Sequence, residues 1–113
     1  MNLRELQDRV DKWIKSYGVR YFDEKTNTLL LMEEMGEFTR LVARTYGEQS
    51  FKDKTDEQGV KEKIADEIAD IIFVLNCLAN QMEIDIEQAV ERNFNKKTER
   101  DAERHRNNDK INN

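Results

Sequence analysis

The sequence of 113 residues contains no proline and only four glycines. Proline breaks helix interiors, and both residues punctuate turns and sheets, so their scarcity favours long helices joined by few loops. A single cysteine, Cys77, excludes a disulfide within the chain. No apolar run approaches the ~18 residues of a membrane span, and the polar N-terminus is unlike a secretory signal. We therefore expect a cytoplasmic protein without a membrane segment.

Charge is abundant and apolar content is ordinary, at 38% and 37% of the residues. Helices with one packed face and one solvated face account for both values. The net charge of −5 argues against a partner that is a nucleic acid polymer, because such binding usually requires a basic surface. A small anionic ligand remains compatible with this charge, since a metal ion can bridge carboxylates to phosphates.

Apolar residues recur at three- and four-residue steps in four segments, which predicts four helices. Their predicted bounds are 2–17, 26–46, 56–82 and a segment that starts just after Asp85 and ends near Arg104. The apolar run 71–75 lies inside the third period without turn residues, so we interpret it as helix buried on more than one side. The short turn 83–85 favours antiparallel packing of the third and fourth helices. We predict an all-α fold, a four-helix bundle over residues 1–104, followed by a frayed polar tail, 105–113.

Several residues are suited to the ends of these helices. Gly18 and Gly47 follow the first and second helices, where glycine commonly terminates a helix. Thr55, three residues before Gln58, has the spacing of a capping box for the third helix. Asp85 is a good N-cap for the fourth helix.

Acidic side chains occupy positions where a helix would normally be apolar. Glu34 lies in the middle of the apolar stripe of the second helix, and Glu67 lies in that of the third. Glu37 and Asp70 each follow three residues later, at the edge of the same stripe. Two helices therefore direct a pair of carboxylates each toward one seam.

Four carboxylates in a seam would repel one another, so either their pKa values rise or a cation holds them together. Hard oxygen ligands on rigid helices suit Mg²⁺, with Mn²⁺ as the alternative. Two other interpretations stay open. The pairs can be solvated surface residues, as such pairs usually are, or they can form a network with Lys63 and Arg44.

Other common site chemistries find no support. A di-iron bundle needs a Glu-x-x-His motif on each of two helices, and the chain has one histidine, His105. The sequence also lacks a glycine-rich phosphate loop, a CxxC pair and the residues of a Ser-His-Asp triad.

The acidic motifs and their surroundings resemble a known family. Glu33-Glu34-x-x-Glu37 stands in LLLMEEMGEFTRLV, and Glu67-x-x-Asp70 stands in KIADEIADIIFVLNCLA. This pattern is similar to that of the MazG-like all-α nucleoside triphosphate pyrophosphohydrolases, over nearly the whole chain. The resemblance implies that Glu34, Glu37, Glu67 and Asp70 bind the metal, and that Glu33 assists by holding a further metal or orienting the attacking water. It also implies hydrolysis between the α- and β-phosphates, releasing a monophosphate and pyrophosphate.

Candidate substrate-binding residues lie on the first and last helices. Basic residues repeat every four positions on the last helix, and the resemblance implies that two of them, Lys96 and Arg100, contact phosphates. A solvated face paired with Glu99 and Glu103 would have the same pattern. Trp13 is a candidate for stacking on the base, although aromatic residues are more often core.

The apolar third helix leaves surface that a chain of this length does not cover, which predicts a homo-oligomer. The resemblance implies a homodimer or homotetramer with sites near subunit interfaces. Two alternative functions stay open. A phosphoribosyl-ATP pyrophosphohydrolase carries a similar acidic signature, and a non-catalytic helical bundle would bind a partner protein or sense a nucleotide.

Overall fold

The computed structural model describes residues 1–51 and 57–112. In this part the chain forms four α-helices and one π-helical turn, and no strand, which confirms the all-α prediction. The elements are α1 (Leu3–Trp13), η1 (Ile14–Gly18), α2 (Glu24–Tyr46), α3 (Glu57–Gln81) and α4 (Ile86–Arg106). Within the same residues, none of the helices is long and apolar enough to cross a bilayer.

The helix ends follow from short polar side chains. Asp85 accepts a hydrogen bond from the Gln88 amide at 3.1 Å, so its predicted N-cap role is confirmed. Asp23 caps α2 in the same way, and the helix therefore begins two residues before the predicted start. Gly47 ends α2, where a Cβ would lie 2.4 Å from the Ala43 carbonyl oxygen. The predicted capping box at Thr55 lies outside the described residues.

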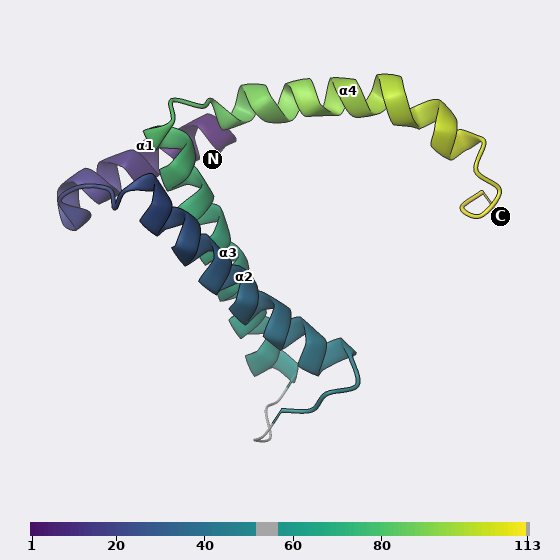
Figure 1. The fold of residues 1–113 in the computed structure, drawn as a ribbon, viewed down its shortest axis with the longest axis horizontal. Coiled ribbons are helices and arrows are strands. Elements are labelled where there is room, and N and C mark those ends of the chain that lie inside the picture. Colours follow the sequence, from purple (N-terminus) through teal and green to yellow (C-terminus); the bar gives the residue numbers. More distant parts are fainter. Residues whose placement is uncertain (52–56, 113) are drawn as a thin grey trace.

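The helices α2 and α3 run antiparallel as a long hairpin that carries most of the packing (Figure 1). The core is small, and no large side chain is completely buried in the described part of the chain. Its buried apolar residues are Val10, Leu41, Val60, Cys77, Leu78 and Ala79. Burial raises the pKa of the Cys77 thiol to about 11, so Cys77 acts as a small apolar core residue.

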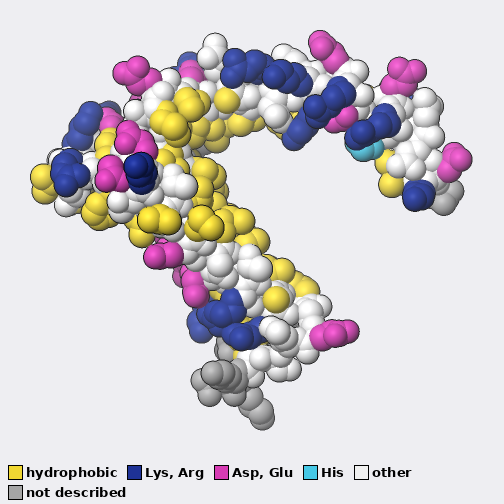
Figure 2. All heavy atoms as spheres, in the orientation of Figure 1, with side chains coloured by type: hydrophobic (Ala, Val, Ile, Leu, Met, Phe, Trp, Pro, Cys, Tyr) yellow, Lys and Arg dark blue, Asp and Glu magenta, His cyan; other side chains and the backbone are white. Residues whose placement is uncertain are grey.

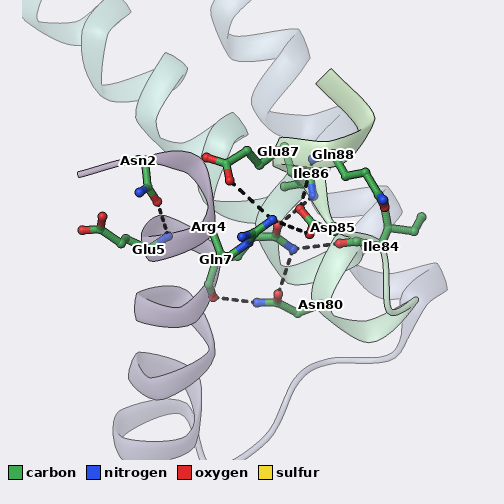
Figure 3. A network of polar contacts seen from close by, with 10 residues as sticks. All are labelled: Asn2, Arg4, Glu5, Gln7, Asn80, Ile84, Asp85, Ile86, Glu87 and Gln88. Atoms are coloured by element: carbon green, nitrogen blue, oxygen red, sulfur yellow. Dashed lines mark hydrogen bonds and ion pairs between the residues drawn. The ribbon is translucent and has the colours of Figure 1, made fainter. Parts of the chain in front are cut away.

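A polar network joins α1 to the turn between α3 and α4 (Figure 3). Gln7, only 8% exposed, donates to the Ile84 carbonyl at 2.8 Å and to Asn80 Oδ1 at 3.1 Å. Its own Oε1 accepts from the first amide of α4, Ile86, at 2.8 Å. Arg4 adds an ion pair of 3.0 Å to Asp85. One face of α1 thereby holds two groups of the turn, the last-turn residue Asn80 of α3 and the first amide of α4.

This turn directs α4 away from the hairpin instead of back along α3 (Figure 1). The predicted antiparallel packing of these two helices is therefore wrong for the single chain. Glu83 adopts a positive φ of 56°, and the Gln7 network then fixes the direction in which α4 leaves. At its far end α4 continues to Arg106, and Asn112 donates to the His105, Arg106 and Asn108 carbonyls. The fourth helix therefore ends two residues beyond the predicted Arg104, and the fraying of the tail stays a prediction.

Candidate metal centre

Three of the predicted carboxylates converge between α2 and α3. Glu34 comes from α2, and Glu67 and Asp70 come from α3, one turn apart. Each residue offers one carboxylate oxygen, and the three oxygens lie within 4.8 Å of one another. The two glutamates are half-buried and Asp70 is exposed, so the cluster opens to solvent on one side. We call these three residues the carboxylate cluster.

The protonation of the carboxylate cluster is unusual for surface carboxylates. A hydrogen bond with Glu67 raises the pKa of Glu34 above its ordinary 4.5, and burial and the charges of Glu67 and Glu37 act in the same direction. Burial, followed by the charge of Glu34, raises the pKa of Asp70. Glu34 and Asp70 therefore resist being negative at the same time without a cation.

The cluster has the properties of a site for a hard divalent cation. Glu67 Oε2 is fully buried and has no hydrogen-bond partner among residues 1–51 and 57–112. An unpartnered buried carboxylate oxygen is costly, and a metal ligand bond would satisfy it. All three donors are carboxylate oxygens, the ligands that Mg²⁺ and Mn²⁺ prefer.

The other two predicted acidic residues lie outside this group. Glu37, whose side chain is 53% exposed, forms an ion pair of 3.0 Å with Arg40 on the same helix. Glu33 is exposed on α2 next to Glu34. The alternative network finds no support, because neither Lys63 nor Arg44 pairs with the carboxylate cluster in the described part of the chain.

The predicted phosphate-binding residues are separated from the carboxylate cluster of their own chain. Lys96 and Arg100 lie on α4, which extends away from the hairpin (Figure 1). Arg100 is also paired with the neighbouring Asp101 through its Nε, at 3.0 Å from Oδ1. A single chain therefore does not bring these two cations to the three carboxylates.

Trp13 lies closer to the cluster than the cations do. Its ring packs edge-on against Phe73, with ring centroids 5.6 Å apart and an interplanar angle of 89°. Phe73 stands three residues after Asp70 on α3, so the two side chains are neighbours on the helix surface. Sequence analysis did not single out Phe73, because helical periodicity alone does not show that α1 crosses α3 at this level.

The comparisons with known proteins agree with the geometry. Residues 22–105 match the model of the MazG nucleotide pyrophosphohydrolase domain. The chain belongs to the MazG nucleotide pyrophosphohydrolase family. It is therefore an enzyme of the nucleotide pyrophosphohydrolase class, and the MazG match spans both helices that carry the carboxylate cluster.

MazG relatives share both sequence and fold with this chain. The uncharacterized protein YpjD of Bacillus subtilis is 36% identical over 102 residues, which cover 90% of this chain and 88% of YpjD. A crystal structure of YpjD, a candidate pyrophosphatase, matches with a TM-score of 0.74 and 34% identity over 85% of this chain and 94% of that one. The Bacillus-conserved MazG protein, a nucleotide pyrophosphohydrolase, matches with a TM-score of 0.72 and 33% identity, covering 89% and 94%.

Proposed function

We propose that this MazG enzyme hydrolyses a nucleoside triphosphate, ribo- or deoxyribo-, to the monophosphate and pyrophosphate with the help of Mg²⁺ or Mn²⁺. The observation that carries the proposal is the convergence of three carboxylate oxygens within 4.8 Å, one residue of which has a buried, unpartnered oxygen. Glu34, Glu67 and Asp70 would hold the metal. Glu37 would join them by leaving Arg40, one turn along α2 from Glu34.

The residues of the chain have defined tasks in this reaction. A bound divalent ion supplies Lewis acid chemistry, which neutralises phosphate charge and lowers the pKa of a water. Glu33, exposed beside the cluster, would orient that water for attack on the α-phosphorus. The water oxygen forms the new bond to phosphorus, the bond to the bridging oxygen breaks, and pyrophosphate leaves. No covalent nucleophile from the protein is needed.

We also propose that the enzyme is a homo-oligomer, either a dimer or a tetramer. The radius of gyration is 18.1 Å, whereas a compact domain of this length has about 13 Å. Three residues spaced along α3 and one residue just after its end are each more than 40% exposed: Ile68, Ile72, Leu75 and Met82. We call them the open stripe of α3. Hydrophobic side chains also line the inner side of the bend between α3 and α4 (Figure 2).

A second copy would make use of both features. It would cover the open stripe of α3, and its α4 would deliver Lys96 and Arg100 to the carboxylate cluster of the first copy. This arrangement accounts for cations that lie far from the carboxylates of their own chain. A particle that stays at the monomer mass of 13.5 kDa at micromolar concentration would contradict it.

The first test is pyrophosphate release from a panel of ribo- and deoxyribonucleoside triphosphates, with Mg²⁺, with Mn²⁺ and with a chelator. We expect metal-dependent release, with the monophosphate as the other product. Release of inorganic phosphate instead would show that a different bond is cut. Absence of release from every nucleotide would favour phosphoribosyl-ATP as the substrate, and then the non-catalytic bundle.

The matched variants are Glu67→Gln and Glu62→Gln, both on α3. Glu67→Gln removes a charged ligand while keeping its shape, so we expect turnover to fall by about a hundredfold or more. Glu62 is exposed and outside the carboxylate cluster, so turnover should be retained. Circular dichroism should show the same helix content in both. Equal turnover in the two variants would refute the assignment of Glu67.

A further inference from the structure

Two aromatic rings stand side by side at the end of α1. Tyr17 in η1 lies 5.6 Å from Trp13, with an interplanar angle of 46°. Trp13 is 49% exposed and Tyr17 is 75% exposed. The Tyr17 hydroxyl makes no hydrogen bond in the described part of the chain. Both rings therefore present aromatic surface to solvent. The edge-on contact with Phe73 holds the Trp13 ring against α3.

The backbone that carries Tyr17 is strained and held in place. η1 is a π-helical turn, and such turns occur frequently at functional sites. Val19 follows with φ 71° and ψ −57°, and Arg20 donates to the Gly18 carbonyl at 2.8 Å, which defines a γ-turn of the strained type. A β-branched residue rarely adopts this conformation, and it persists where the surroundings enforce it.

The enforcing contacts come from Tyr21, just after the γ-turn. Its hydroxyl donates to Asp11 Oδ1 on α1 at 2.5 Å and accepts from Asn80 Nδ2 on α3 at 3.1 Å. The segment 14–21 continues directly from α1, and its far end is thereby anchored to both α1 and α3. Tyr17 projects from a preorganised loop, which lowers the entropic cost of ordering it on a ligand.

We propose that Trp13 and Tyr17 together form the nucleobase subsite of this enzyme. The subsite rests on the proposed function, because it takes the base of the same nucleotide whose phosphates meet the carboxylate cluster. Its position supports this occupant: Trp13 packs on Phe73, and Phe73 is the neighbour of Asp70 one turn along α3. Bases stack on aromatic rings with little dependence on sequence, so two rings suit a nucleobase as a ligand.

Another hollow in the described part of the chain is a rival position for the base. This hollow of about 920 Å³ lies at the open end of the α2–α3 hairpin, on the opposite side of the cluster along the helices. Its lining includes Phe38, Tyr46, Arg44 and Lys61. Tyr46 is the last residue of α2, and it does not belong to a strained, anchored segment as Tyr17 does. Tyr46→Ala is therefore the matched variant for Tyr17→Ala.

The test uses the only tryptophan of the chain, whose emission reports on Trp13 directly. The probes are α,β-methylene analogues of the four nucleoside triphosphates with Mg²⁺, and inorganic tripolyphosphate as a probe without a base. We expect at least one analogue to change the emission and tripolyphosphate to leave it unchanged. Tyr17→Ala should weaken the affinity for that analogue by roughly tenfold, and Tyr17→Phe should retain it.

Turnover provides the second measurement. In Tyr17→Ala we expect KM to rise by a similar factor while kcat and inhibition by tripolyphosphate stay unchanged. Three results would each overturn the proposal. The affinity for the analogue could be unchanged in Tyr17→Ala, or it could fall in Tyr46→Ala instead. The emission could also change with protein dilution and not with nucleotide. The proposed function fails separately, if the analogues bind as expected but no triphosphate releases pyrophosphate.

Discussion

Glu67 connects the folding of this chain to its chemistry. A carboxylate oxygen that is buried without a partner lowers the stability of the folded protein, yet it is free to act as a ligand of a cation. Glu34 and Asp70 show the same conflict in their pKa values, which are both raised. Stability and metal binding are therefore expected to depend on pH together.

In the metal-free protein, the raised pKa values of Glu34 and Asp70 favour folding at low pH. A carboxyl group whose pKa is higher in the folded than in the unfolded chain binds extra protons when folded, so it favours folding at low pH. That contribution is lost as the pH rises above the ordinary values, 4.5 for Glu34 and 3.8 for Asp70, through the raised ones. Mg²⁺ should restore stability on the alkaline side of this window, where the ligands are ionised.

Thermal unfolding at a series of pH values, with Mg²⁺ and with chelator, measures this effect. We expect the gain in Tm from Mg²⁺ to grow as the pH rises through the window. Glu34→Gln should reduce both the pH dependence without metal and the gain from Mg²⁺, whereas Glu48→Gln, exposed beyond the end of α2, should change neither. A gain from Mg²⁺ that is the same in both variants would show that the ion binds elsewhere.

At the scale of the elements, one polar side chain controls the direction of α4. Gln7 is buried between α1 and the α3–α4 turn, and it bonds to Asn80, the Ile84 carbonyl and the Ile86 amide (Figure 3). These bonds have no substitute in an apolar side chain. The orientation of the whole C-terminal helix thus depends on an amide about 80 residues away in sequence, as the separations of 77 and 79 residues show.

We predict that Gln7→Ala destabilises the protein by about 2 kcal/mol, because it leaves part-buried backbone groups of Ile84 and Ile86 without partners. Urea unfolding measures this loss, with Gln88→Ala on the exposed side of α4 as the control. Spin labels on α3 and α4 should also show a broader distance distribution in Gln7→Ala. A narrow distribution equal to that of the unchanged protein would mean that Glu83 and Arg4 suffice to orient α4.

Features that depend on local sequence could be predicted, whereas features that depend on tertiary contacts could not. The helices were predictable because apolar spacing and caps such as Asp85 are local. The convergence of Glu34, Glu67 and Asp70 was also predictable, since each lies on or beside an apolar stripe that must pack. The direction of α4 was not, because it depends on tertiary bonds of Gln7 and on a positive φ at Glu83. The position of the Glu37 side chain was not predictable from spacing alone, because Arg40, three residues away, forms an ion pair with it.

At the scale of the whole molecule, the extended shape of the chain is the observation that bears on assembly. In the proposed homo-oligomer, the open stripe of α3 and the projecting basic helix α4 would each meet a symmetric partner. If sites are shared in this way, each one takes its carboxylates from one chain and its cations from another. Two variants that are inactivated in different halves of the site should then complement each other in mixed oligomers.

We predict this complementation for Glu67→Gln and the double variant Lys96→Ala, Arg100→Ala. Each should be nearly inactive alone, the first for lack of a metal ligand and the second for lack of phosphate contacts. After mixed refolding in equal amounts, about a quarter of the original activity should return, because half of the dimers are mixed and each of these has one intact site. Mixing Glu67→Gln with Asp70→Asn, which damage the same half of the site, is the control and should restore nothing. Absence of recovery in the first mixture, with mixed oligomers shown to form by mass spectrometry, would mean that α4 does not complete the site of another chain.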